Sequence, residues 1–140
     1  MKDKFFLDTN LFIYTFNDKA SDKQIKATEL IELALLKDSG SISYQVIQEF
    51  VNVVSKTFQP RMAPDDISSY LKSTMFPICN VYFTKGLVDK AIKILDSLKY
   101  GWYDSLIISA ALESGVSILY TEDLQNGQVI EGVEIVNPFS

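Results

Sequence analysis

The sequence predicts an α/β fold with a central, mostly parallel sheet and helices on both of its faces. Short apolar runs bounded by polar residues alternate along the chain with longer segments whose apolar residues recur at helical spacing. Such alternation of strands and helices is typical of parallel sheets. The chain has 140 residues, of which 47% are hydrophobic and 22% charged. This size and composition favour one compact domain over residues 1–140.

The first predicted strand covers residues 4–8, with an apolar run that stops at Asp8. The run LFIYTF that follows shortly after it favours one or two helical turns. Ser21 and Gln24 have the spacing of a capping box, so a longer helix is predicted to begin there. The apolar face of this helix consists of Ala27, Leu30, Ile31, Ala34 and Leu35.

The middle of the chain is predicted to contain a strand over 41–43, a helix capped by Ser43, and a further helix that begins at Pro64. Proline followed by two acidic residues suits the first turn of a helix. Residues 78–83 favour another strand. The helix after Ser43 ends at Pro60, and its inward residues are Ile47, Phe50, Val51, Val54 and Phe58.

The last part of the chain is predicted to hold two helices and two strands. The residues GWYD, 101–104, form a turn into a helix over 105–114, which Gly115 ends. The runs VSILYT and VEIVN are the final strands. An earlier helix, which precedes the GWYD turn, is capped by Thr84, and its inward residues are Leu87, Ala91, Ile94, Leu95 and Leu98.

The composition excludes several kinds of chemistry. The chain has no histidine, so the commonest general base and transition-metal ligand is missing. Cys79 is the single cysteine, which rules out an internal disulfide and fits a reducing cytoplasm. No secretory signal or membrane-spanning segment is expected, because Asp8 interrupts the first apolar run and the other runs are too short. The net charge of −5 argues against a passive nucleic-acid binder.

Four acidic residues stand at positions where a carboxylate is notable, although each has an ordinary explanation when taken alone. Asp8 lies at the carboxyl end of the first strand, where it can cap the next helix. Glu49 lies among apolar residues of a helix, but it can also face solvent. Asp104 lies in or just before the first turn of a helix, where it can serve as a cap. Because that helix is apolar nearly all round, its start is expected to be buried. Asp123 comes with Glu122 after a strand, where a solvated loop is common.

Taken together, the four positions favour a metal site. Asp8, Asp104 and Asp123 are all expected at one edge of the sheet, and Glu49 can reach that edge from its helix. Converging carboxylates repel one another unless a cation compensates them. The only arginine is Arg61, and no lysine adjoins any of the four acids. Mg²⁺ and Mn²⁺ prefer carboxylate and water oxygens, so one of them is the expected partner.

Three stretches of the chain resemble the PIN domain, and more narrowly the VapC-type toxin ribonucleases of toxin–antitoxin pairs. They are FLDTNLFIY, SYQVIQEF and YDSLIISAALESGVSILYTEDLQNGQVIEGVEIVNPF. The resemblance implies a PIN-like fold with a mostly parallel sheet and four acids around one or two Mg²⁺ or Mn²⁺ ions. These acids match Asp8, Glu49, Asp104 and Asp123, and supporting polar positions match Thr9, Asn10 and Thr121. The family usually has tryptophan directly before the third acid, whereas here Tyr103 separates Trp102 from Asp104.

The resemblance also implies an activity and partners. The expected activity is metal-dependent endoribonuclease cleavage of RNA, in which water attacks the phosphodiester and leaves a 5′-phosphate and a 3′-hydroxyl. Asp8 and Asp104 are expected to bind the metal directly, and Glu49 and Asp123 either directly or through water. The expected partners are the RNA substrate, a VapB-like antitoxin and a second copy of the chain in a homodimer, with no membrane.

Two other functions are compatible with parts of the sequence. The first is a phosphatase with a nucleophilic aspartate after its first strand. Such enzymes carry a DxD signature, but in this sequence the position two residues after Asp8 is Asn10. The second is an interaction module of PIN-like fold without catalysis. The presence of all four acids argues against it, and a lack of RNA cleavage with any divalent ion would favour it.

Overall fold

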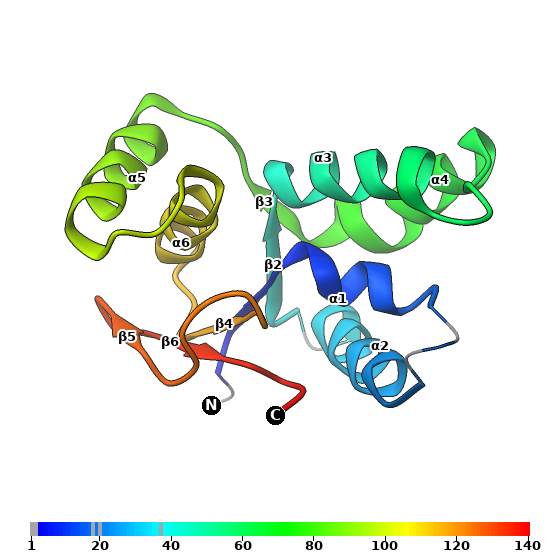
Figure 1. Ribbon diagram of the computed structural model, residues 1–140, viewed down its shortest axis with the longest axis horizontal. Coiled ribbons are helices and arrows are strands. Elements are labelled where there is room, and N and C mark those ends of the chain that lie inside the picture. The colour runs from blue at the N-terminus through cyan, green and yellow to red at the C-terminus, as the bar shows by residue number, and fades with distance from the viewer. Residues whose placement is uncertain (1–2, 18, 20, 37) are drawn as a thin grey trace.

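A computed structural model describes residues 3–17, 19, 21–36 and 38–140, and over these residues the protein has an α/β architecture (Figure 1). Six strands form one sheet in the order β3-β2-β1-β4-β6-β5. Their pairings are parallel except for that of β5 with β6, which is antiparallel. The predicted fold class is therefore confirmed. The strands are β1 Phe5–Leu7, β2 Gly40–Ser43, β3 Cys79–Val81, β4 Ile118–Tyr120, β5 Val129–Ile130 and β6 Val133–Val136.

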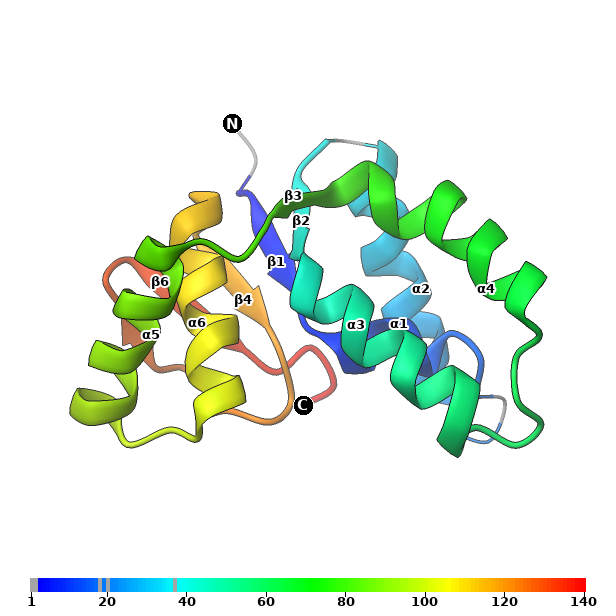
Figure 2. The same cartoon turned by 90° about the horizontal axis from the view of Figure 1, so that it is seen from above.

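Helices cover both faces of this sheet (Figures 1 and 2). One face carries α5 and α6, which pack against each other, and the other carries α1 to α4. No helix among the described residues is long and apolar enough to cross a membrane. The α-helices are α1 Thr9–Tyr14, α2 Ser21–Leu36, α3 Tyr44–Asn52, α4 Pro64–Tyr70, α5 Lys85–Leu98 and α6 Trp102–Ser114.

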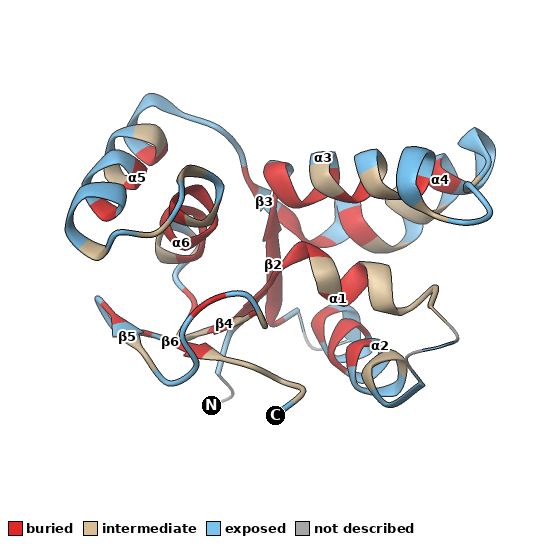
Figure 3. Ribbon diagram, in the orientation of Figure 1, coloured by how far each residue is buried: buried red, intermediate tan, exposed pale blue. Residues whose placement is uncertain are grey.

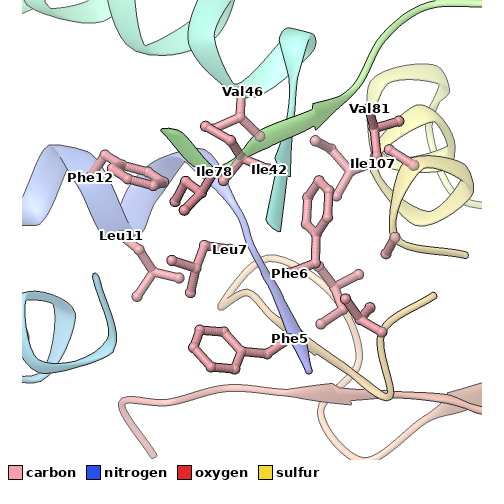
Figure 4. Close-up of a cluster of buried hydrophobic side chains, with 14 of the residues drawn as sticks. Phe5, Phe6, Leu7, Leu11, Phe12, Ile42, Val46, Ile78, Val81 and Ile107 are labelled. Atoms are coloured by element: carbon pink, nitrogen blue, oxygen red, sulfur yellow. The ribbon is translucent and has the colours of Figure 1, made fainter. Parts of the chain in front are cut away.

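Strand β1 is the centre of the hydrophobic core. It lies between β2 and β4, where Phe5 pairs with Gly40 on one side and with Ile118 on the other. Its residues are buried, and they meet side chains from the helices on both faces (Figures 3 and 4). Because β1 runs parallel to both neighbours, its carboxyl end lies in the middle of the sheet edge where α/β proteins usually bind ligands. The residue at that position is Asp8.

A close contact between α2 and β2 requires a glycine at position 40. A Cβ atom added to Gly40 would lie 2.2 Å from the Cβ of Ala34 and 2.8 Å from its Cα. Distances this short between carbon atoms are strongly repulsive, so the backbone of β2 can approach α2 only without a side chain. This contact also sets how closely the two elements pack beside β1.

Several sequence predictions of helix ends are confirmed. The hydroxyl of Thr84 caps α5 by accepting a hydrogen bond from the Leu87 N–H at 3.1 Å. Gly115 follows α6 with a φ of 77°, the left-handed conformation that favours glycine. Ser21 is the first residue of α2, and the cap position before it lies outside the described residues. Gln24 donates its side-chain amide to the carbonyl of Thr15 at 3.0 Å.

Other local predictions were wrong. Helix α6 begins at Trp102, three residues before its predicted start, and Gly101 occupies the cap position. Asp104 lies in the first turn of α6, which is one of the two positions expected for it. Ser43 precedes α3, but its hydroxyl makes no capping hydrogen bond and is buried without a partner. Leu35 and Leu95 are exposed although their spacing placed them on the inner faces of their helices.

Short irregular elements were also missed. Helix α3 continues as a π-helical turn, η1 Val53–Thr57, three residues before Pro60. Helix α4 continues through a second π-helical turn and a 3₁₀ turn, η2 Leu71–Met75 and η3 Phe76–Ile78, directly into β3. Helical periodicity extends across such turns, so the spacing of apolar residues does not reveal them.

Candidate metal centre

The four predicted acids line one cavity of about 330 Å³ at the carboxyl edge of the sheet. They come from the end of β1, from α3, from the first turn of α6, and from the segment after β4. Among the described residues that line the cavity, none is a lysine or an arginine. These lining residues are Asp8, Thr9, Asn10, Glu49, Asn52, Val53, Asp104, Ile107 and Asp123.

Asp8 is buried and serves as the cap of α1. Its Oδ1 accepts a hydrogen bond from the Thr9 N–H at 2.7 Å, and its Oδ2 accepts one from the Thr121 hydroxyl at 2.7 Å. Burial is the main reason why the pKa of Asp8 rises from 3.8 to about 6. The charges of Glu49 and Asp123 raise this pKa further, whereas the two hydrogen bonds lower it. The capping explanation is therefore correct for Asp8, and the same carboxylate also lines the cavity.

Glu49 is held by neighbours from two helices. The Thr9 hydroxyl donates a hydrogen bond to Oε1 of Glu49 at 2.6 Å, and the Gln45 side-chain amide donates to Oε2 at 3.2 Å. The same amide group donates to the carbonyl of Tyr103 at 3.2 Å. Gln45 thus links Glu49 to the first turn of α6, next to Asp104. The sequence contained a weak signal for this role, since Gln45 precedes Glu49 by one helical turn.

Asp104 is the least restrained of the four acids. It is partly buried in the first turn of α6, and its carboxylate makes no hydrogen bond to any described residue. The expected burial of this position is therefore only partial. Partial burial raises its pKa, and so do the charges of Asp123 and Glu49. A carboxylate in this turn is favoured by the helix dipole, and it remains available to a ligand in the cavity.

Asp123 lies on the segment that leaves β4. Its Oδ2 accepts a hydrogen bond from the Asn10 side-chain amide at 3.0 Å, and its N–H donates to the Thr121 hydroxyl at 3.2 Å. Asp123 is exposed, but loss of hydration around its carboxylate, followed by the charge of Glu122, raises its pKa, and the bond from Asn10 opposes this rise. The neighbouring Glu122 does not line the cavity and is instead paired with Lys23.

The donor chemistry of this cavity suits a hard divalent cation. Carboxylate, amide and hydroxyl oxygens surround it, and three of its acids have raised pKa values that a bound cation would lower again. Among the described residues, no three histidine, cysteine, aspartate or glutamate side chains lie close enough to hold an ion between them. Mg²⁺ does not need such a cage, because it usually keeps several waters and binds one or two carboxylates.

Other residues of the site were missed by sequence reasoning. Asn52 at the end of α3, Val53 at the start of η1 and Ile107 in α6 also line the cavity. No local pattern marks them, since each fits the polar or apolar spacing of its own helix. Lys23 and Tyr14, which bind Glu122, are distant from it in sequence and could be found only from the fold.

Comparison with known proteins adds a family and a group of similar structures. The family model described as the PIN domain matches residues 5–129. No curated protein sequence matches the chain. A DNA-bound VapBC from Salmonella typhimurium is similar in structure, with a TM-score of 0.67 and 22% sequence identity, over 96% of this chain and 97% of that one.

Two further solved structures are similar over nearly the whole chain. A toxin–antitoxin complex from Klebsiella pneumoniae has a TM-score of 0.68 and 16% identity, covering 96% of this chain and 98% of that one. VapC20 of Mycobacterium tuberculosis, described as a Sarcin-Ricin loop cleaving toxin, has a TM-score of 0.64 and 15% identity, covering 94% of this chain and 99% of that one. At these identities the likeness shows a common fold.

Proposed function

The chain belongs to the PIN domain family, and from this premise we propose that it is a metal-dependent endoribonuclease, the toxin of a type II toxin–antitoxin pair. The observation that carries the proposal is the cavity at the carboxyl edge of the sheet, which is lined by four acids and, among its described residues, by no basic side chain. We propose that residues 1–140 act as a single PIN domain, and that the protein works on RNA in the cytoplasm.

Each acid has a role in this proposal. Asp8 and Asp104 would hold Mg²⁺ or Mn²⁺ directly, and Glu49 and Asp123 would hold it directly or through water. When bound, the ion would lower the pKa of water and offset negative charge on the phosphodiester. Asp104 suits direct binding because its carboxylate has no hydrogen-bond donor among the described residues. Asp8 suits it because each of its oxygens uses one acceptor site and keeps another.

The supporting polar residues fix the acids in place before any ligand binds. Thr9 links Asp8 to Glu49, because its N–H donates to Asp8 and its hydroxyl donates to Glu49. Thr121 likewise joins Asp8 to the backbone of Asp123. Asn10 holds the Asp123 carboxylate. Since these bonds orient the carboxylates, little reorganisation is needed when the phosphodiester and the attacking water enter the cavity.

Cleavage of a short single-stranded RNA by the purified protein tests this proposal. EDTA should abolish cleavage, Mg²⁺ or Mn²⁺ should restore it, and the new ends should be a 5′-phosphate and a 3′-hydroxyl. Asp8→Asn and Asp104→Asn should each remove activity in folded protein, whereas Asp96→Asn, at an exposed position of α5, should keep it. Full activity of a clean preparation in EDTA would contradict the proposal.

We further propose a small antitoxin partner with an amphipathic segment and a basic side chain. Solved structures that contain a chain of similar fold include toxin–antitoxin complexes. An arginine of the partner could pair with the carboxylates of the cavity in place of the metal. Expression of the protein alone should stop growth, and co-expression of the antitoxin should rescue it. Harmless overexpression of catalytically active protein would count against this role.

A homodimer, as the resemblance implies, would appear as twice the monomer mass in light scattering.

A further inference from the structure

The side chain of Glu122 is bound on both of its oxygens by residues outside the acidic cavity. Tyr14 of α1 donates its hydroxyl to Oε1 of Glu122. Lys23 of α2 forms an ion pair with Oε2 at 2.9 Å, and its ammonium group also lies 3.3 Å from the Tyr14 hydroxyl. We call Tyr14 and Lys23 together the Glu122 clamp.

The aromatic ring of Phe139, near the C-terminus, completes the surroundings of the clamp. The Lys23 Nζ lies 4.9 Å from the centre of the Tyr14 ring and 5.4 Å from that of Phe139. The two rings meet edge to face at 5.3 Å. The C-terminal segment, which ends beside α1 and α2 (Figures 1 and 2), therefore helps to fix the position of the lysine.

The clamp is one of three attachments that hold consecutive residues of a single segment. Thr121 is bonded to Asp8, Glu122 to the clamp, and Asp123 to Asn10. Asn10 and Tyr14 lie one turn apart on α1, where side chains four positions apart face the same way. Helix α1 therefore binds two adjacent acids, with Asn10 on Asp123 and Tyr14 on Glu122.

From this arrangement we infer that Tyr14 and Lys23 are positioning residues, which hold Glu122 away from the cavity and thereby present Asp123 to it. The inference rests on the proposed function, because it concerns the same metal site. Adjacent acids on a flexible segment would compete for one cation. With both oxygens of Glu122 occupied, only Asp123 is directed toward Asp8 and Glu49. Partners that orient a metal ligand from outside typically change metal affinity by about 10- to 100-fold when they are removed.

Two sets of variants separate positioning from the effect of charge. Tyr14→Phe removes one hydroxyl and keeps the ring and the net charge. The double variant Lys23→Met with Glu122→Gln removes the ion pair and also leaves the net charge unchanged. Lys23→Arg keeps a cation and its donors, so it should behave as the parent does. Lys26→Met, at an exposed position of the same helix, is the matched control.

Two measurements on folded protein, checked by circular dichroism, decide the matter. In metal-free protein, hydrogen exchange of the backbone amides of residues 121–123 should be faster in Tyr14→Phe and in the double variant. Mn²⁺ binding, followed through the electron paramagnetic resonance of free Mn²⁺, should weaken about tenfold in both. Lys23→Arg and Lys26→Met should match the parent in both measurements.

The outcomes distinguish this inference from the proposed function. If the parent binds Mn²⁺ and the two test variants match it in exchange and in affinity, the clamp has no positioning role and the proposed function stands. If exchange accelerates but Mn²⁺ affinity is unchanged, the clamp stabilises the segment only, and the inference is likewise overturned. If the parent binds no Mn²⁺ at all, the proposed metal site fails and the inference fails with it.

Discussion

Thr121 donates its hydroxyl to Oδ2 of Asp8 at 2.7 Å, and this bond joins the carboxyl ends of two neighbouring parallel strands. Both residues are buried. The same hydroxyl accepts a hydrogen bond from the Asp123 N–H at 3.2 Å, so one side chain orders two of the four acids. A buried carboxylate is tolerated only when its oxygens have partners, and Thr121 supplies one of the two that Asp8 has.

Thr121→Val should therefore destabilise the protein although it nearly preserves side-chain volume. It leaves one buried oxygen of Asp8 without a donor, which typically costs about 1–3 kcal/mol of unfolding free energy. Because the hydroxyl lowers the pKa of Asp8, its loss should raise that pKa further. Urea unfolding at neutral pH measures the cost. Thr121→Ser keeps the hydroxyl and serves as the control, and equal stability of the valine and serine variants would show that the bond contributes nothing.

Asp8 should make the metal-free protein less stable as pH rises from about 4 to about 6. Its pKa in the folded chain is about 6, against an ordinary 3.8, so the folded state binds this proton more tightly than the unfolded state does. The stabilisation from the bound proton is complete below the ordinary pKa of 3.8 and is lost as pH rises through the folded-state pKa of about 6. The difference corresponds to about 3 kcal/mol of unfolding free energy.

Asp8→Asn tests this pH dependence because an amide resembles the protonated acid and does not titrate. Its Oδ1 can accept from the Thr9 N–H, and its amide can donate to the Thr121 hydroxyl. In EDTA at neutral pH the variant should be more stable than the parent by about 1–3 kcal/mol, and the advantage should shrink toward pH 4. Thermal melts across this range provide the measurement. A variant that melts below the parent at every pH would show that Asp8 acts only as a cap.

Gly40→Ala should destabilise the fold, because its Cβ would lie 2.2 Å from that of Ala34. Relief of such overlap requires α2 and β2 to move apart, at a cost of about 3 kcal/mol. Gly101→Ala is the matched control, since a Cβ there has nothing within 4 Å and its backbone, with φ −64° and ψ 169°, suits any residue. Its effect should stay within about 1 kcal/mol. Similar denaturation midpoints for the two variants would refute this account of the α2–β2 contact.

The features predicted well from sequence were those set by periodicity and by strand ends. Alternation of elements predicted the sheet class, and the position of Asp8 directly after a buried strand placed it at the carboxyl edge of the sheet. Burial is the largest cause of the raised pKa values of Asp8 and Asp104, and the charges of the neighbouring acids raise these values further. Burial of an individual side chain depends on the assembled fold, so the sequence could not rank these two causes.

The features that the sequence did not reveal depend on contacts between distant residues. Apart from the family resemblance, nothing in the local sequence distinguishes Glu122 from Asp123. Their surroundings differ because Tyr14 and Lys23 bind Glu122, whereas Asn10 binds Asp123. Strand β5 has two residues and forms only because a hairpin returns it to β6. The start of α6 at Trp102 was missed because a glycine before aromatic residues reads as a turn.

The central claim is that the cavity around Asp8, Glu49, Asp104 and Asp123 binds a divalent cation, and calorimetric titration of Mn²⁺ into the metal-free protein tests it most directly. The parent should bind Mn²⁺ and gain roughly 2.7 kcal/mol of stability at a hundredfold excess over the dissociation constant. Asp104→Asn should lose most of this binding, while Asp96→Asn should keep it. A parent that binds no Mn²⁺, or an Asp104→Asn variant that binds it as tightly as the parent, would contradict the claim.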